Sequence, residues 1–327
     1  MVTTDMDQGQ LNTIVRILDR GQFNNSYKFA LLRSLAAFGR DSNSGNVVIK
    51  TEWLAGKFIE FFWPLTLRFN IRQATVPDKD PVVMRYIRKE GQKHDLSPET
   101  KLDDFRKRFP DRYEALVRKV AANAFGDVLK RFHTVLRQEV GPRIYEQIDG
   151  GIRLNEETRK FLESNHKVLD FLAIGSWIKF TERYTSAPRL YEKINGLEQK
   201  RSTLKPYRKF LFEDLRERDC FYCERSLDTK FEVDHVIPWS FVAEDKAWNL
   251  VLACSDCNGP KSSSIPPEVF IAHLNERNQI IMNNFDSNLP PKVMRDFAEW
   301  RHADLCQHIE TLAARCIADG FGTWTGP

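Results

Sequence analysis

The sequence predicts a mainly α-helical chain that carries one small unit of two strands and a helix near its C-terminus. Residues 1 to about 200 contain no cysteine and repeat apolar residues at helical spacing. Residues 220–261 instead hold two Cys-x-x-Cys pairs, with an alternating apolar run and a second apolar run between them. The chain of 327 residues, 42% hydrophobic and 29% charged, is long enough for two domains with a sizeable core.

The N-terminal part is expected to be a helical domain of unassigned fold that spans residues 1–199. A short strand is expected at residues 47–49, and a loop that contains two prolines at residues 71–82. Apolar residues at helical spacing predict its helices, at residues 11–20, 26–38, 52–62, 82–89, 111–139, 155–164, 165–184 and 187–194. Their apolar stripes are interpreted as core rather than as ligand sites.

The small unit is expected at residues 200–285, after a polar and basic hinge at residues 198–209. Residues 286–327 are expected to form a long amphipathic helix, 292–318, followed by an untethered tail. The other elements predicted after the hinge are helices at residues 210–218, 258–263 and 268–278 and strands at residues 230–237 and 249–253.

The two Cys-x-x-Cys pairs bracket the predicted strands. Thiolates are soft ligands, and two such pairs supply the four sulfur atoms of a closed tetrahedral zinc site. Thirty residues separate the pairs, more than a zinc ribbon usually has, so a folded insert is expected between them. We interpret the insert as a β-hairpin whose ends are held, with the next helix, by a structural Zn²⁺ on Cys220, Cys223, Cys254 and Cys257. A zinc ribbon without chemistry of its own is the alternative.

An acidic residue, a histidine and an asparagine lie within the same stretch. Asp234 and Asn258 offer hard oxygen donors, which suit Mg²⁺ or Mn²⁺ better than a thiolate-bound zinc. A neutral His235 could take a proton from water that attacks a metal-bound phosphodiester. Adjacent residues of a strand point to opposite faces, so Asp234 and His235 share a site only where the strand ends or bulges. The step Ile237-Pro238 indicates such a distortion, and a histidine satisfied in the core is the alternative.

These residues give the C-terminal third a resemblance to HNH (ββα-metal) endonucleases of the HNN type, in the branch that has four zinc-binding cysteines. The segments VDHVIPWS and WNLVLACSDCNGPK carry the match, with Asn249 fourteen and Asn258 twenty-three residues after His235. The resemblance implies that His235 is the general base and that Asn249 orients the loop that presents it. It also implies that Asp234 and Asn258 hold one divalent cation and that Lys261 contacts a substrate phosphate.

Charge is distributed unevenly along the chain. Residues 1–200 hold 34 Lys and Arg against 26 Asp and Glu, whereas residues 201–327 hold 15 against 19. The basic half is therefore a candidate surface for docking duplex DNA, and solvated helix faces are the alternative. Near the first cysteine pair, four basic residues could hold a nucleic-acid strand against the site, namely Arg201, Lys205, Arg208 and Lys209.

The expected function is that of a metal-dependent endonuclease that hydrolyses phosphodiester bonds of DNA, with double-stranded DNA as the favoured substrate. An RNase of the same superfamily and a non-catalytic, zinc-stabilised module that binds nucleic acid are the alternatives. A role in bacterial or phage defence, restriction or a mobile element is a hypothesis from analogy. The same analogy suggests a homodimer or a partner protein of a defence system.

Membrane insertion and secretion are not expected. The chain has no run of eighteen apolar residues, and its N-terminus lacks a basic segment followed by an apolar one. Cys306 and Cys316 would lie about 15 Å apart on one helix, too far for a disulfide. Because the other four cysteines are interpreted as metal ligands, the reducing cytoplasm is the expected location.

Overall fold

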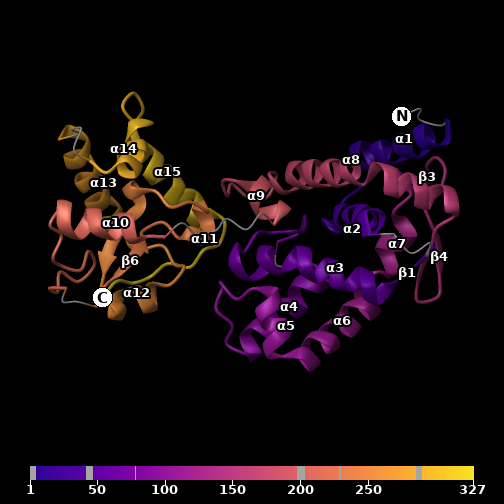
Figure 1. Cartoon of the computed structure of the whole chain (residues 1–327), viewed down its shortest axis with the longest axis horizontal. Helices are drawn as coiled ribbons and strands as arrows, with labels where there is room; N and C mark the ends of the chain where they lie inside the picture. Colours follow the sequence, from indigo (N-terminus) through magenta and orange to yellow (C-terminus); the bar gives the residue numbers. More distant parts are fainter. Residues whose placement is uncertain (1–4, 42–46, 78, 197–202, 228–229, 285–288) are drawn as a thin grey trace. The chain divides into compact units, whose positions relative to one another are not determined.

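A computed structural model of the chain describes residues 5–41, 47–77, 79–196, 203–227, 230–284 and 289–327. The chain divides into two compact units, Met1–Thr185 with Leu190–Leu197 and Ser186–Arg189 with Glu198–Pro327. Both units are mainly helical and contain small sheets (Figure 1), which confirms the predicted fold class. The expected hinge, 198–209, lies outside the described residues as far as residue 202.

Most helices of the N-terminal unit lie where apolar spacing predicts them. They are α1 (Asp5–Arg20), α2 (Tyr27–Asp41), α3 (Thr51–Trp63), the π-helical η1 (Pro64–Arg68), α4 (Val82–Lys93), α5 (Leu102–Arg108), α6 (Pro110–Ala124), α7 (Gly126–Arg131), α8 (Glu156–Thr181) and α9 (Leu190–Asn195). One antiparallel sheet has the order β1-β5-β4, and β2 and β3 form a separate pair. The strands are β1 (Val48–Lys50), β2 (Thr134–Val135), β3 (Gln138–Glu139), β4 (Glu146–Ile148) and β5 (Gly151–Arg153).

Helices α2 and α8 lie side by side in the core of this unit (Figure 1). They approach closely at Gly39, where an added Cβ would lie 2.3 Å from the carbonyl oxygen of Leu162. Trp177 of α8 is fully buried, and its ring centroid lies 5.3 Å from that of Phe62 in α3. Glycine is therefore required where the two backbones meet, and aromatic rings fill the space beside them.

The prediction of a single helix at residues 111–139 is wrong. Helix α6 ends at Ala124, α7 ends at Arg131, and the chain then turns back as the β2–β3 hairpin. The two residues of the turn, Leu136 and Arg137, have φ angles of +49° and +67°. Tight hairpin turns need this conformation, but it is usually marked by glycine or asparagine, so these residue types did not indicate the turn.

A second difference in this unit concerns residues 155–184, where two helices were expected. The structure has one helix, α8, over most of this range. The side-chain oxygen of Asn155 accepts a hydrogen bond from the backbone N–H of Thr158 at 2.7 Å and so caps the first turn. No proline or glycine cap interrupts the helix at residue 165, and the two predicted segments therefore join.

The C-terminal unit is built around a hairpin and the helix that follows it. Strands β6 (Glu232–His235) and β7 (Leu250–Ala253) pair antiparallel, from Glu232 opposite Ala253 to His235 opposite Leu250, without a bulge. The remaining elements are α10 (Lys205–Lys209), the π-helical η2 (Phe210–Asp214), α11 (Trp239–Val242), the 3₁₀ helix η3 (Ala247–Asn249), α12 (Ser255–Lys261), α13 (Glu268–Asn283), α14 (Pro291–Ala298) and α15 (Leu305–Ala318). Among the described residues, no helix combines the length and the apolar character that crossing a bilayer requires.

Two expectations for the end of the chain are wrong. The long helix 292–318 is divided into α14 and α15, because the Asp304 carboxylate accepts a hydrogen bond from the N–H of Gln307 and starts a new helix. The tail is tethered, since the N–H of Trp324 donates to the Ile265 carbonyl at 2.8 Å. Its indole ring packs against Tyr222, with 5.1 Å between the ring centroids.

Burial of His133 makes the stability of the N-terminal unit depend on pH. The side chain lies between β2 and the aromatic ring of Tyr145, and its Nε2 accepts a hydrogen bond from the N–H of Ile144 at 2.9 Å. Burial, together with the smaller effect of the nearby Arg143, lowers the pKa of His133 to about 4. The neutral ring therefore suits the folded state, and protonation favours the unfolded state.

We predict that acidification destabilises this unit through His133. As the pH falls below 6.5, His133 becomes protonated in the unfolded chain, whereas in the folded chain it stays neutral down to about pH 4. The free energy of unfolding therefore decreases as the pH falls from 6.5 to 4. The free energy of unfolding should drop by about 2 kcal/mol more in the wild type than in His133→Gln between pH 7 and pH 5. Chemical denaturation at both pH values measures it, and equal losses in the two proteins would contradict the assignment.

Candidate metal centre and active site

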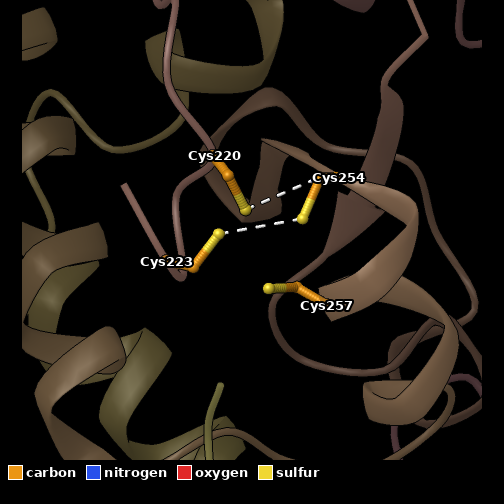
Figure 2. Close-up of side chains that lie close together, drawn as sticks. All are labelled: Cys220, Cys223, Cys254 and Cys257. Atoms are coloured by element: carbon orange, nitrogen blue, oxygen red, sulfur yellow. Dashed lines mark hydrogen bonds between the residues drawn. The ribbon is translucent and has the colours of Figure 1, made fainter. Parts of the chain in front are cut away.

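The four cysteines lie together where the hairpin meets α12 (Figure 2). Cys220 and Cys223 belong to a turn before β6, Cys254 directly follows β7, and Cys257 lies in α12. All four sulfur atoms lie within 4.8 Å of one another, and those of Cys223 and Cys254 are 3.8 Å apart. The structure thus brings together the four cysteines that were predicted to act together.

This geometry fits a tetrahedral zinc ion. Four sulfur atoms at 2.3 Å from zinc would lie about 3.8 Å apart at the corners of a tetrahedron. Burial raises the pKa of the Cys257 thiol above its usual range, and the other three thiols raise it further. Thiols packed so closely cannot all ionise unless a cation lies among them. The four cysteines could therefore hold a zinc ion.

Backbone N–H groups support the sulfur cluster. The N–H of Cys254 donates to Sγ of Cys220 at 3.4 Å. Burial raises the pKa of the Cys220 thiol. Hydrogen bonds from the backbone N–H groups of Cys254, Cys223 and Tyr222 lower it, and the resulting pKa is below the usual value. The N–H of Phe221 also donates to the Leu252 carbonyl at 2.9 Å, which fastens the first cysteine turn to β7. The cluster is therefore tied to the hairpin by the backbone as well as by the sulfur atoms.

The side chain of Asn249 fastens the loop that leaves β6. It is fully buried, its Oδ1 accepts a hydrogen bond from the N–H of Ile237 at 2.8 Å, and its Nδ2 donates to the Ile237 carbonyl at 2.9 Å. The backbone carbonyl of Asn249 also accepts from the N–H of Val236 at 3.0 Å. Only an amide side chain can accept from and donate to one residue in this way. The backbone just after His235 is thus fixed by a single asparagine.

The imidazole of His235 contacts a carboxylate that lies in the connection between the strands. Nε2 of His235 is 3.0 Å from Oδ1 of Asp245, and both side chains are 8% exposed. The Asp245 carbonyl accepts a hydrogen bond from the hydroxyl of Tyr207 at 2.8 Å. The N–H of Ala247 donates to Asp296 at 3.0 Å, and burial raises the pKa of that carboxyl group. The loop that carries Asp245 is therefore held at two points.

The carboxylate of Asp234 has different neighbours. Its Oδ2 accepts a hydrogen bond from the Tyr222 hydroxyl at 2.6 Å and lies 3.0 Å from Nζ of Lys261. Lys261 is completely buried and also donates to the His235 carbonyl at 2.7 Å. Burial raises the pKa of the Tyr222 phenol, and the charge of Asp234 raises it further, so Tyr222 remains a hydrogen-bond donor. No described residue donates a hydrogen bond to Oδ1 of Asp234, which leaves that oxygen open to a ligand.

Asn258 lies in α12 beside the same strand. Its Nδ2 donates to the Glu232 carboxylate, two residues before Asp234 on β6. Side chains two residues apart on a strand share one face, so Glu232 and Asp234 point to the side on which α12 packs. Because Nδ2 is directed to Glu232, the amide oxygen of Asn258 remains available as a hard donor. Three oxygen-bearing side chains are thus grouped on this face.

Comparison with protein-family models places these residues in a known family. Residues 220–267 match the family described as HNH endonuclease. The chain carries an HNH endonuclease domain. Residues 7–140 match a family described as a domain of unknown function (DUF8808). No curated protein and no solved structure matches the chain. The match supports a nuclease of the HNH superfamily, and therefore a nucleic-acid substrate.

A cavity of about 740 Å³ in the unit of the HNH domain is lined by three of the four basic residues that were predicted to hold substrate, Lys205, Arg208 and Lys209. The fourth, Arg201, lies outside the described residues. Phe212 and Phe231 share its wall, and their rings stack with 4.7 Å between the centroids. The guanidinium carbon of Arg208 lies 4.1 Å from the centroid of Phe231. Because Phe231 directly precedes β6, the cavity begins beside the strand that carries Asp234 and His235.

Two expectations for the HNH domain need correction. β6 ends at His235, but its pairing has no bulge, so the imidazole and the Asp234 carboxylate leave β6 on opposite faces and have separate partners. Lys261 was expected to contact a substrate phosphate, but its ammonium group is buried and paired with Asp234. A buried carboxylate requires a cationic partner, and Lys261 supplies it.

Three polar partners of the site were missed in the sequence. Glu232 could have been found, because it precedes Asp234 by two residues on an alternating strand. Asp245 and Tyr222 carried no such signal, since one lies in a connection and the other inside a Cys-x-x-Cys turn. Their positions depend on how the connections fold around the hairpin.

We predict that the cysteine cluster is required for folding of the HNH domain. The wild type should contain about one tightly bound zinc per chain, and Cys254→Ser should lose both the zinc and the folded hairpin, because metal binding and folding are coupled. Elemental analysis and protection from proteolysis measure the two effects. Cys306→Ser, outside the cluster, is the matched control and should keep its zinc. A Cys254→Ser protein that is folded and free of metal would contradict a structural role.

We also predict that Lys261 acts on stability rather than on substrate. Lys261→Met leaves the Asp234 carboxylate buried without its cation and should lower the free energy of unfolding by about 3–5 kcal/mol. Chemical denaturation measures the loss, and Lys230→Met, at an exposed lysine before β6, should change it little. If Lys261→Met had unchanged stability but bound DNA more weakly, the result would contradict this prediction and favour a contact of Lys261 with a substrate phosphate.

Proposed function

We propose that the HNH domain is a metal-dependent endonuclease that hydrolyses phosphodiester bonds of double-stranded DNA. The observation that carries the proposal is the family match, which covers every proposed catalytic residue between Cys220 and Lys261. The two hydrogen bonds from the Asn249 side chain to the backbone of Ile237 support it, because a general base must be held in a fixed position. Catalytic roles are assigned here to His235, Asp234, Asn258 and Asn249.

His235 would act as the general base. With Nε2 directed to the Asp245 carboxylate, the imidazole is held as the tautomer that carries its proton on Nε2. The lone pair of Nδ1 is then free to accept a proton from the attacking water. Asp245 would also stabilise the imidazolium that forms, and thereby assist proton transfer without contacting the substrate. Asn249 keeps this ring in place through the backbone of Ile237.

Asp234 and Asn258 would hold the catalytic cation, Mg²⁺ or Mn²⁺. Both offer an oxygen atom that is not used in the hydrogen bonds described above, and hard oxygen ligands suit these ions. When bound, such a cation stabilises the charge that develops on the scissile phosphate and the leaving oxygen. Because the imidazole and the carboxylate leave β6 on opposite faces, one phosphate can meet both only at the end of the strand, where His235 is the last residue.

The basic cavity beside β6 would hold the DNA backbone. Lys205, Arg208 and Lys209 supply positive charge to a unit whose sequence is acidic overall, and phosphate attraction dominates affinity for nucleic acid. Arg208 stacked on Phe231 offers a flat cationic surface to a phosphate or a base. A role in bacterial or phage defence, a homodimer and a partner protein are hypotheses from family analogy. A cytoplasmic location is a hypothesis from the use of cysteines as metal ligands.

We predict that His235→Ala lowers the rate of plasmid nicking by about 10²–10⁴-fold in Mg²⁺ or Mn²⁺ while DNA binding and folding are retained. Removal of a general base slows proton transfer but leaves phosphate contacts intact. His273→Ala is the matched control, because it makes the same substitution at an exposed histidine of α13 in the same unit. It should nick plasmid at the wild-type rate.

Three outcomes would contradict this function. Equal nicking by the wild type and His235→Ala would remove the catalytic role of the imidazole. DNA binding without cleavage in any divalent metal would favour the zinc-stabilised binding module. Faster digestion of RNA than of DNA by the wild type, lost in His235→Ala, would identify an RNase with the same catalytic residues.

A further inference from the structure

The N-terminal unit contains a cavity of about 970 Å³. Its wall is formed by the segment before α2, the loop before α4, the junction of α6 with α7, and the β2–β3 hairpin. This volume is typical of sites that enclose a small organic ligand and is much larger than a single water or ion needs. The cavity lies wholly within one unit and has no part in the nuclease site.

The wall of the cavity has an excess of positive charge. Four basic residues line it, namely Lys28, Lys79, Arg131 and Arg137. Two acidic residues line it as well, but Asp80 pairs with Arg88 at 2.8 Å, and Asp127 lies 3.5 Å from Arg131. Lys28, Lys79 and Arg137 form no ion pair with any carboxylate of the described residues. The cavity therefore presents uncompensated cations.

Among the lining residues, Lys28 gives the strongest indication that the cavity binds an anion. Only 7% of this residue is exposed, and its Nζ donates to the Thr134 carbonyl at 3.0 Å and lies 5.8 Å from the centroid of Phe23. Thr134 and Phe23 both line the cavity, so the ammonium group lies at its wall. Burial, together with the smaller effect of the Arg131 charge, lowers the pKa of Lys28 to about 8. A buried cation beside a second cation is unfavourable unless an anion compensates it.

We propose that this cavity binds a nucleotide, with Lys28 and Arg137 neutralising its phosphate groups. The volume exceeds that of inorganic phosphate, and the wall offers groups for the rest of a nucleotide. The half-buried ring of Phe23, which packs on Phe29 with 4.6 Å between the centroids, gives the wall an apolar edge that a base can contact. The exposed amides of Gln22 and Asn24 can donate to and accept from the edge of a base.

A purely structural role for Lys28 makes a different prediction. In that case its hydrogen bond to Thr134 only joins α2 to the β2–β3 hairpin, and no ligand is needed. Gln in place of Lys28 keeps a hydrogen-bond donor but removes the charge. Lys28→Gln therefore separates the two roles, because it should fold while losing attraction for phosphate. Arg137→Ala provides a second variant, at an exposed side chain whose loss does not threaten folding.

Isothermal titration calorimetry of the full chain tests the proposal, with ATP, GTP, inorganic phosphate and a short DNA duplex as separate probes. All proteins carry His235→Ala, so the duplex stays intact. At least one of the two nucleoside triphosphates should bind, and Lys28→Gln should weaken that binding by about tenfold to a hundredfold. Arg137→Ala should weaken it as well. Lys160→Gln, at an exposed lysine of α8 away from the cavity, should bind as tightly as the parent protein.

The proposal is overturned if neither triphosphate binds, or if Lys28→Gln binds it as tightly as the parent protein. Equal affinity for inorganic phosphate would show that the base contributes nothing, and would also overturn it. Binding of the duplex but not of the triphosphates, with dependence on Lys28, would assign the cavity to backbone phosphates of DNA instead. Because the readout is binding, a failure of the proposed nuclease function would leave all these results unchanged.

Discussion

The C-terminal unit depends on four sulfur atoms that are kept within 4.8 Å of one another. This arrangement closes a segment of thirty residues between two short turns, which a hairpin with four residues in each strand could not fix alone. It could also hold a cation, which would allow crowded and partly buried thiols to lose their protons together. Every proposed catalytic side chain lies on the hairpin, on its connection or on the helix that carries Cys257. Their positions are therefore consequences of this closure.

A second constraint lies in the interior of the same unit. The ammonium group of Lys261 joins α12 to β6 by contacting both the Asp234 carboxylate and the His235 carbonyl. One buried cation thus sets the distance between the helix and the strand at the point where the chemistry is proposed. The contact uses Oδ2 of Asp234 and leaves Oδ1 without a hydrogen bond from a described residue. In the proposed function, one oxygen of this carboxylate would serve the structure and the other would bind the catalytic cation.

Spacing along the chain predicted the parts of the site that local chemistry determines. The four cysteines and the paired strands follow from ligand preference and strand alternation, whereas the succession of His235, Asn249 and Asn258 was recognised by its resemblance to HNH endonucleases. The contact of His235 with Asp245 did not follow, because it depends on a connection held by Tyr207 and Asp296 from distant helices. The β2–β3 hairpin was missed for a different reason, since its turn uses left-handed conformations without glycine. The burial of Lys261 is likewise a property of packing, which residue spacing does not encode.

The anchored end of the chain has a practical consequence. Ile265 pairs with the backbone around Thr323, and the ring of Trp324 lies against both Tyr222 and Phe270. The hydroxyl of Tyr222 in turn donates a hydrogen bond to the Asp234 carboxylate. The ring of Trp324 is therefore connected through Tyr222 to the proposed metal ligand. Its indole offers a native fluorophore beside the proposed site.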